Sequence, residues 1–418
     1  MRIAYLTQSY PPMISGAAIS AQKTAEAMAR LGHQVLVIAA SDREYPYHSY
    51  KDNIAVLRLS SYKNPFRVGQ RLMLYPHRNI MKFLKQFKPD IIHTHDPLQI
   101  GILAIEYARR TRIPVTLTIH QLPWFAASYL PKSFKPLIER FLWIYARMAL
   151  KWYTSLIAPT QTIANIIETK TELKPDVISY GLDLQTFHPH LFSDPEPATR
   201  KKLNLPPDIP IIIHVGRLDK DKSVDMVIRA AVPAIRKSEA HLLIVGDGCQ
   251  MGNLTRLCKE LGIGRRVHFT GFLPQSELPE IYRIADVFVT ASEIETQGIV
   301  LLEAAASGLP IVAVNATCIS ETVHHRLNGI LVKPGDLPAL SEAIITLVNA
   351  PKRAYVMGKE GRILAEDHDI QLTWLRHEKF YLEMIKHVHA QQATRQSKML
   401  DYREIIKMLL GLKETSNR

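Results

Sequence analysis

Charged and hydrogen-bonding side chains gather in one short segment, HVGRLDKDKS, which runs from His214 to Ser223. Gly216 allows a close backbone approach, and Ser223 is a suitable N-cap for a following helix. Arg217 and Lys222 would then lie beside a helix N-terminus, which itself attracts anions. Because arginine binds phosphate through two parallel hydrogen bonds and lysine supplies a point charge, this segment predicts a phosphate site.

The same segment permits two other interpretations. In a solvated basic turn, the cations would pair with Asp219 and Asp221. The order Asp219-Lys-Asp221 also matches the letters of a D-x-D metal motif. Two neighbouring lysines and the lack of a third acidic residue nearby argue against a divalent cation. We therefore expect no metal ion here.

Two carboxylates, Glu295 and Glu303, lie in the segment EIETQGIVLLE. In one continuous helix they would stand roughly 12 Å apart, at about 1.5 Å per residue. The carboxyl groups of retaining hydrolases lie about 5–5.5 Å apart, and those of inverting ones under about 10 Å. Such a pair can be a solvated helix stripe, but Glu303 is in an apolar run where an unpaired charge is costly. The spacing suits a long ligand such as a nucleotide-sugar, with its phosphates over the helix N-terminus near Gly298.

The short motif Gly246-Asp247-Gly248 resembles the start of a dinucleotide-binding fingerprint. Its sixth position, however, is Met251 rather than glycine, and the motif does not follow the first strand of its unit. We expect a tight strand-to-helix turn, which argues against a nicotinamide-dependent dehydrogenase.

Three histidines, His93, His95 and His120, end two predicted strands in the first half of the chain. Buried histidines at strand ends are usually core residues with satisfied hydrogen bonds. Three on neighbouring strands favour a functional role for His120. A loop of small residues around Gly16 could bring backbone N–H groups close to a phosphate.

Short apolar runs alternate with helical patterns along the whole chain, which predicts two successive doubly wound α/β units. A segment rich in proline, aspartate and histidine interrupts this alternation and predicts a linker. We expect strands at 3–7, 35–39, 91–94, 115–119, 156–158, 211–215, 242–245, 267–270, 287–290 and 311–314. The expected divisions are a first Rossmann-like domain at 1–182, a linker at 183–208, a second Rossmann-like domain at 209–372, a helix at 373–390 that returns to the first domain and a basic amphipathic tail at 391–418.

The 418 residues are 47% apolar and 22% charged, which excludes a disordered or fibrous protein. No apolar run is long enough to cross a bilayer, and the opening MRIAYLTQSY does not have the pattern of a secretory signal. Three cysteines without paired spacing argue against a disulfide framework or a structural zinc site. We therefore expect a cytoplasmic protein.

The net charge of +13 is concentrated in residues 51–150, which hold 16 basic and 5 acidic side chains. Such asymmetry indicates an anionic partner, either nucleic acid or an acidic membrane surface. A solvated basic face without a partner is the alternative.

Five segments together resemble the family 4 retaining glycosyltransferases, which have the GT-B fold of two Rossmann-like domains facing across a cleft. They are HVGRLDKDKSVD, LLIVGDG, FTGFLP, SEIETQGIVLLEAAASGLPIVA and the hinge-like YGLDLQTFHP. The resemblance covers about residues 1–390. It implies sugar transfer from a nucleotide-sugar with retention of configuration, without a metal ion and with no cofactor beyond that co-substrate.

The resemblance also implies roles for individual residues. Arg217 and Lys222 would hold the diphosphate, Glu295 the sugar hydroxyls and Glu303 the ribose diol, while His120 would lie beside the transferred sugar. His120, Glu295, Arg217 and Lys222 are thus the expected catalytic residues. The remaining expected donor contacts are Gly16, Gly216, Gly271, Phe272, Leu273, Thr296, Gln297, Gly298 and Ile299, and the expected acceptor contacts are His95 and Trp124.

The chain departs from the family pattern at two loops. Many relatives have a Gly-Gly pair in the first loop, where this chain has only Gly16. Many also have Gly-Gly before the glutamate that follows residues 311–314, and here Asn315-Ala-Thr-Cys-Ile-Ser precedes Glu321. The role of Glu321 as the equivalent glutamate is accordingly open.

Two aromatic and basic segments in the first half bear on the acceptor: residues 63–88 and 132–153. They suit an enzyme lying on anionic lipid at the inner face of the cell membrane, and they could equally be helices that face the core. The motifs HTHDP and ETQG resemble those of the diacylglycerol glucosyltransferases, which favours UDP-glucose as donor and diacylglycerol as acceptor.

Three alternatives stay open at this point. The same fold could use GDP-mannose or UDP-N-acetylglucosamine on a soluble or cell-envelope saccharide. A nucleic-acid-binding protein is disfavoured because no RNA-binding or helix-turn-helix motif is present. A catalytically inactive sensor is disfavoured because Arg217, Lys222, Glu295 and Glu303 are all present. The sequence gives no indication of the oligomeric state.

Overall fold

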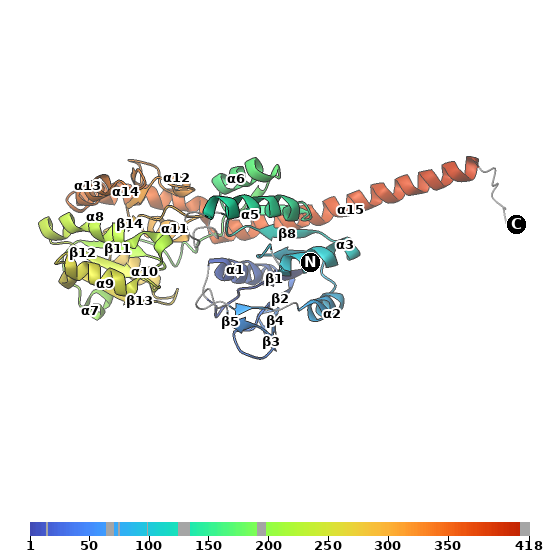
Figure 1. Ribbon diagram of the computed structural model, residues 1–418, viewed down its shortest axis with the longest axis horizontal. Coiled ribbons are helices and arrows are strands. Elements are labelled where there is room, and N and C mark those ends of the chain that lie inside the picture. Colours follow the sequence, from blue (N-terminus) through green and yellow to red (C-terminus); the bar gives the residue numbers. More distant parts are fainter. Residues whose placement is uncertain are drawn as a thin grey trace. The chain divides into compact units, whose positions relative to one another are not determined.

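A computed structural model describes residues 1–13, 16–63, 71–73, 76–97, 99–123, 134–189 and 198–409. The chain divides into two compact units, which Figure 1 shows coloured along the sequence. Unit 1 comprises residues 1–120, 146–157 and 375–418, and unit 2 comprises residues 121–145 and 158–374.

The N-terminal sheet has eight strands in the order β10-β9-β8-β7-β1-β2-β4-β3. The pairings from β9 to β4 are parallel, and β3 adds antiparallel to β4 at one edge. The central strands are buried because their residues are almost all apolar. The strands are β1 (Arg2–Thr7), β2 (Gln34–Ala40), β3 (Tyr47–Lys51), β4 (Ile54–Leu59), β7 (Ile91–Thr94), β8 (Val115–Thr118), β9 (Ser155–Ala158) and β10 (Asp176–Val177).

Within the ranges that the structure describes, five helices and a small hairpin accompany this sheet in the sequence. α1 follows β1, and α3 packs against β7, β8 and β1. The helices are α1 (Gly16–Arg30), α2 (His77–Phe87), α3 (Gln99–Thr111), α5 (Lys135–Leu150) and α6 (Gln161–Thr171), and the hairpin is formed by β5 (Tyr62–Lys63) and β6 (Arg71–Leu72).

The sheet of unit 2 has six parallel strands in the order β13-β12-β11-β14-β15-β16. Numbered within the unit, this is the order 3-2-1-4-5-6 of the doubly wound dinucleotide-binding fold. Strand order reverses between β11 and β14, and ligands in such sheets bind at the carboxyl ends of the strands at that point. The strands are β11 (Ile211–Val215), β12 (His241–Val245), β13 (Val267–Gly271), β14 (Val287–Thr290), β15 (Ile311–Val314) and β16 (Gly329–Val332).

Helices pack on the sheet of unit 2 and bury its apolar strands in one continuous core. α8 and α13 contact each other. α8 also contacts β12 and β14, and α13 contacts β14, β15 and β16. The helices are α7 (Ala198–Lys202), α8 (Val224–Lys237), α9 (Met251–Glu260), α10 (Leu278–Arg283), α11 (Ile299–Ala306), α12 (Ile319–Thr322), α13 (Leu337–Val348) and α14 (Pro351–Ala365), with 3₁₀ turns η1 (Lys220–Lys222), η2 (Gly264–Arg266) and η3 (Glu366–His368).

The predicted α/β fold class is confirmed, and each predicted strand is present to within one or two residues. The predicted strands do not include β3, β4, β16 or the two-residue strands β5, β6 and β10. β3 is an edge strand whose residues are mostly exposed, so its sequence YHSYK has no apolar signature. β4 and β16 are only partly buried, so their apolar runs are weaker signals, although turn residues precede both: Asp52-Asn53 before β4 and Asn328 before β16.

The division into units differs from the predicted domain boundaries. Residues 158–182, predicted for the first domain, group with unit 2. The described parts of the predicted linker at 183–208 also pack there, because Leu184, Phe187 and Leu205 lie in the core of unit 2.

The C-terminal helix α15 runs from Ile370 to Leu409 without interruption and so extends beyond the predicted returning helix at 373–390 into the tail. Within the described residues, no helix combines the length and the apolar character needed to cross a membrane.

Candidate functional site

The carboxyl ends of β11 and β14 bring Lys222 and Glu295 together. These strands are neighbours in the sheet, and the loops that follow them carry the two side chains. The Lys222 ammonium lies 2.6 Å from a carboxylate oxygen of Glu295, and the two side chains are 16% and 14% exposed. The pair therefore occupies the position where this fold binds its ligands.

Arg217 lies on the same loop and is paired with carboxylates. Its guanidinium donates to Asp219 and, at 2.8 Å, to Asp221. The side chain is 42% exposed. Arg217 thus makes the ion pairs of the basic-turn interpretation, and a phosphate that binds here would compete with these carboxylates.

Ser223 occupies the N-cap position of α8 but does not cap the helix with its side chain. Its backbone is left-handed, with φ 48°, and its hydroxyl makes no cap hydrogen bond. A side-chain cap needs an extended backbone at this position, which the preceding 3₁₀ turn η1 does not supply. The predicted N-cap position of Ser223 is therefore confirmed, but its side chain does not bond to the helix.

Glycines allow the loops after β11 and β12 to pack backbone against backbone. A Cβ on Gly246 would lie 1.9 Å from the carbonyl oxygen of Gly216, and one on Gly248 would lie 2.6 Å from the backbone of Leu218. The tight turn predicted for Gly246-Asp247-Gly248 is confirmed, and its role is to support the loop that carries Arg217 and Lys222.

Gly298 is the N-cap residue of α11, and its backbone is left-handed with φ 71°. The first turn of the helix has no acidic residue, and no side chain caps it. The helix starts directly at Ile299, so its free N–H groups and partial positive charge lie just after the loop of Glu295.

Thr296 and Gln297 are held by a segment that precedes unit 2's sheet in the sequence. The Thr296 carbonyl accepts from the Thr160 hydroxyl at 3.0 Å. The Gln297 side chain is 1% exposed, accepts from the Tyr180 N–H at 2.9 Å and donates to the Ser179 hydroxyl at 2.5 Å. The Gln297 side chain thus anchors the loop that carries Glu295 to Ser179 and Tyr180.

Glu303 is buried at 2% exposure, and its charge is met by hydrogen-bond donors. The Tyr282 hydroxyl donates to it at 2.9 Å, and the Gln275 amide at 3.0 Å. Burial and the Glu303 charge raise the pKa of Tyr282 well above its usual value, so the tyrosine remains a donor. Sequence analysis indicated the need for partners, but not which residues supply them.

The turn at Gly271-Phe272-Leu273 lies at the end of β13. Gly271 has φ 70°, and its carbonyl accepts from the Gly246 N–H at 2.9 Å. Phe272 is 54% exposed. The turn is thereby fixed to the glycine-rich loops, and it presents an aromatic ring to solvent.

Sequence analysis missed His214, which lies one residue before the end of β11. It is 1% exposed, and its Nδ1 donates to the Val289 carbonyl of β14 at 2.9 Å. Burial lowers the pKa of His214 to about 4, so the ring is neutral and Nε2 is a bare acceptor. The only signal was a polar residue in an apolar strand.

Glu321 has a structural partner in the described chain. Its carboxylate accepts from the Gln161 N–H at 2.9 Å and from the Thr162 N–H at 2.6 Å. It therefore neutralises the N-terminus of α6.

In unit 1, His95 and His120 lie at the carboxyl ends of β7 and β8. His95 is 4% exposed, and its Nδ1 lies 2.7 Å from Nε2 of the partly buried His120. Gly16 is the first residue of α1. Trp124 lies outside the described residues.

Two further features bear on ligands. Across the described ranges, histidine, cysteine, aspartate and glutamate form no cluster of three that could hold a metal ion.

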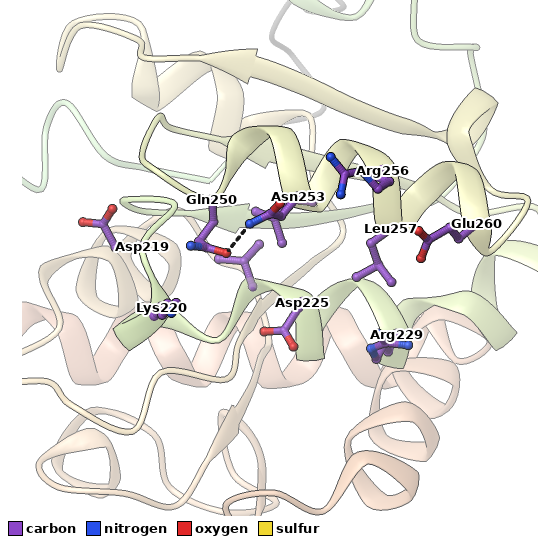
Figure 2. Close-up of a pocket in the computed structure, with 11 residues that line it drawn as sticks. Asp219, Lys220, Asp225, Arg229, Gln250, Asn253, Arg256, Leu257 and Glu260 are labelled. Carbon is purple, nitrogen blue, oxygen red and sulfur yellow. Dashed lines mark hydrogen bonds between the residues drawn. The ribbon is translucent and has the colours of Figure 1, made fainter. Parts of the chain in front are cut away.

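A groove of about 430 Å³ lies between α8 and α9, and Asp219 and Lys220 of the Arg217 loop reach its edge (Figure 2). Its lining mixes both charges, including Asp225, Arg229, Arg256 and Glu260.

Comparisons with known proteins place this geometry in a family. Residues 195–363 match the family model described as glycosyl transferases group 1, and residues 14–186 match glycosyltransferase family 4. The alpha-monoglucosyldiacylglycerol synthase of Acholeplasma laidlawii is 27% identical over 402 residues, which cover 92% of this chain and 98% of that protein.

A second relative and a solved structure extend the comparison. The GDP-mannose-dependent alpha-mannosyltransferase of Mycobacterium tuberculosis is 30% identical over 362 residues, covering 84% of this chain and 89% of that protein. The sucrose-phosphate synthase of Thermosynechococcus elongatus superposes with a TM-score of 0.77 at 21% identity, covering 93% and 100% of the two chains. The fold is GT-B, and the chain belongs to glycosyltransferase family 4.

Proposed function

We propose that this glycosyltransferase moves glucose from UDP-glucose to diacylglycerol, with retention of configuration and without a metal ion. The donor and acceptor follow the name of the Acholeplasma laidlawii relative, almost all of whose length this chain matches. The observation that carries the proposal is the Lys222–Glu295 pair at the switch point of the sheet, beside the N-terminus of α11.

The described contacts support distinct roles at the two ends of the donor. Lys222, Arg217 and the free N–H groups of α11 would neutralise the diphosphate, with Gly216 and Gly16 giving close backbone approach. Glu295 would bind sugar hydroxyls, Glu303 the ribose diol, and the Gly271-Phe272-Leu273 turn the base. Thr296, Gln297, Gly298 and Ile299 would shape the loop around the sugar and phosphates.

The resemblance to the family implies that this reaction is a front-side displacement. The bond between the sugar's anomeric carbon and the diphosphate breaks, and the acceptor oxygen bonds to that carbon on the same face. The acceptor proton passes to the departing diphosphate oxygen. His120 would hydrogen-bond the transferred sugar. Preplaced cations and helix N–H groups stabilise the charge that develops on the diphosphate, which is the largest catalytic contribution expected.

The aromatic face of α5 supports a lipid acceptor. Phe134, Leu137, Phe141, Ile144 and Met148 recur at intervals of three or four residues, and each is more than half exposed. They form one apolar stripe along the helix, while Trp143 and Leu150 are buried on another face. Arg140, Arg147 and Lys151 are exposed beside the stripe, as expected for a helix that lies in an anionic lipid interface.

The other basic segment behaves differently. The helix α2, within residues 63–88, buries Ile80, Met81 and Leu84, so this part of the segment faces the core. We therefore assign the membrane surface to α5, and the enzyme to the inner face of the cell membrane as a peripheral protein.

The test is a transfer assay with dioleoylglycerol in vesicles, half of them containing phosphatidylglycerol. UDP-glucose, GDP-mannose, UDP-N-acetylglucosamine and ADP-glucose are compared, with and without EDTA. We expect α-glucosyl-diacylglycerol, identified by NMR of the anomeric proton, from UDP-glucose alone and with EDTA present. A β-linked product, or activity abolished by EDTA and restored by a divalent cation, would contradict the mechanism.

A second candidate rests on the mannosyltransferase relative, which is the more identical of the two. In that case GDP-mannose would be the donor, and the acceptor would be a soluble or cell-envelope saccharide. Mannosyl transfer in the same assay, with no binding to anionic vesicles, would favour it.

A further inference from the structure

His95 lies between two other histidines in unit 1 and bonds to only one of them. Its ring stacks on that of His93, with centroids 4.5 Å apart, and on that of His120, at 5.0 Å. Its Nδ1 and the Nε2 of His120 are 2.7 Å apart. At 4% exposure His95 is buried, which does not suit the acceptor contact predicted for it from the sequence.

The two nitrogens of His95 have different surroundings. Nε2 is buried and has no hydrogen-bond partner in the part of the chain that the structure describes. A buried N–H without a partner is rarer in proteins than an acceptor that lacks one. The favourable arrangement therefore leaves Nε2 bare and places the proton of His95 on Nδ1, where it is donated to Nε2 of His120. His120 must then carry its own proton on Nδ1.

The groups packed around His95 keep this arrangement neutral. His93 is bonded to the Tyr381 hydroxyl at 2.5 Å and to the Thr118 hydroxyl at 2.7 Å. The titratable rings that contact His95 are Tyr5 on β1, His93 on β7 and His120 after β8. His377 and Tyr381 on α15 pack against His93 instead. Burial lowers the pKa of His120 to about 3 and that of His95 well below its usual value, so neither ring is charged near neutral pH.

We propose that His95 is a positioning residue that holds His120 as the Nδ1–H tautomer with a fixed ring plane. His120 then acts toward a sugar as a donor from Nδ1, since its Nε2 is occupied by His95. The effect on catalysis rests on the function proposed above, whereas the tautomer of His120 does not.

The first measurement reads the tautomer directly. The full chain is labelled with ¹⁵N-histidine, and the His120 signals are assigned by their loss in His120→Gln. We expect a protonated Nδ1 and a bare Nε2 for His120 in the wild type. His95→Asn, whose amide N–H replaces Nδ1–H, should preserve this state, and His95→Gln, whose amide reaches the Nε2 position, should lose it.

The second measurement is kcat and KM for transfer. Loss of a residue that orients a functional histidine typically costs about 10- to 100-fold, so His95→Gln should lower kcat by that amount, with donor KM nearly unchanged, and His95→Asn should recover most of it. The matched control is His241→Leu, because His241 and His268 form a similar stacked pair, 2.9 Å apart, in unit 2. It should change neither measurement.

The outcomes separate the two proposals. A wild-type His120 protonated on Nε2, or the same tautomer in His95→Gln and His95→Asn, overturns the positioning role whatever the activity. A tautomer that follows His95 as expected, in a chain that transfers no sugar, supports the positioning role and overturns the proposed function. If both variants unfold, the wild-type tautomer decides alone.

Discussion

The two units bring very different chemistry to the carboxyl ends of similar sheets. In unit 2 these ends carry charge: Lys222 with Glu295, Arg217 with two aspartates, and a buried Glu303. In unit 1 the corresponding ends carry His95 and His120, which are neutral and bonded to each other.

This contrast follows from what each environment can hold. A buried charge is tolerated only when it is paired, and each ionised group of unit 2 named above contacts an opposite charge or a hydrogen-bond donor. Neutral imidazoles need only one donor and one acceptor, so they fit a buried strand end without counter-charges. The strand ends of unit 2 thus hold paired charges, whereas those of unit 1 hold neutral imidazoles beside the carboxylate of Asp96, which accepts from the Gln8 N–H at 2.5 Å.

The contrast would be broken most severely by Lys222→Ala. The variant removes the cation proposed to neutralise the diphosphate and leaves Glu295 without its partner, so transfer should fall by about 100- to 1000-fold. The measurement is kcat/KM for UDP-glucose. Lys237→Ala, at the exposed end of the same helix α8, is the control and should behave as wild type. Near-normal transfer by Lys222→Ala would remove the charged site from the mechanism.

Glu303→Gln separates charge from packing in unit 2. The amide keeps the size and one acceptor oxygen but loses the charge, and hydrogen bonds to charged groups contribute about 1.5–3 kcal/mol. Donor KM should rise by roughly 10- to 100-fold, with little change in melting temperature. Tyr282→Phe instead leaves the buried carboxylate short of a donor, so it should lower the free energy of unfolding by about 1–3 kcal/mol. Equal donor KM in Glu303→Gln and wild type would exclude the ribose contact.

The lipid side of the contrast is tested on α5. Replacing Leu137 and Phe141 together by glutamate should weaken binding to phosphatidylglycerol vesicles by about tenfold, because apolar burial and attraction to anionic lipid are both lost. Tyr355 and Val356, also exposed and on α14, provide the matched double substitution. Vesicle pelleting that is reduced equally by both pairs would show a general charge effect and exclude α5 as the membrane surface.

The buried neutral histidines of unit 1 should make stability depend on pH, which is a smaller effect. Burial lowers the pKa of His120 to about 3 and of His377 to about 4, and the pKa values of His93 and His95 are also well below the usual 6.5. The unfolded chain therefore binds protons below pH 6.5 that the folded chain does not, so stability should fall progressively from pH 6.5 to about 4.

His377→Leu removes one of these groups. The dependence of unfolding free energy on pH in that range should become shallower by at most about 1.4 kcal/mol per pH unit. Denaturant titrations of wild type and variant at the same ionic strength measure both slopes. Identical slopes would show that His377 is not neutral in the folded chain.

Much of this was accessible from the sequence because the signals were local. Gly246-Asp247-Gly248 forms the predicted turn, and the apolar runs became the predicted strands. Arg217 and Lys222 were predicted as phosphate contacts because they follow a buried strand and lie beside the N-terminus of the next helix. Glu303 was found because it interrupts an apolar helix.

The remainder depends on contacts between residues far apart in the chain. The hydrogen bond of Gln297 to the Tyr180 backbone joins positions 117 residues apart, and Tyr282 meets Glu303 from another helix. No periodicity encodes such pairings. The capping of α6 by Glu321, across 160 residues, is of the same kind. Ser223 was misjudged because residue type indicates a cap, whereas backbone conformation decides it.

The long C-terminal helix has a consequence for how the protein is made. Tyr381 is fully buried and its hydroxyl lies 3.0 Å from that of Tyr5 on the first strand, while Glu378 accepts from His33 at 2.8 Å. The ribosome adds Tyr381 376 residues after Tyr5. The interior around β1 is consequently completed only by residues synthesised much later, and a nascent chain halted before residue 375 should be readily digested by protease within residues 1–120 and 146–157.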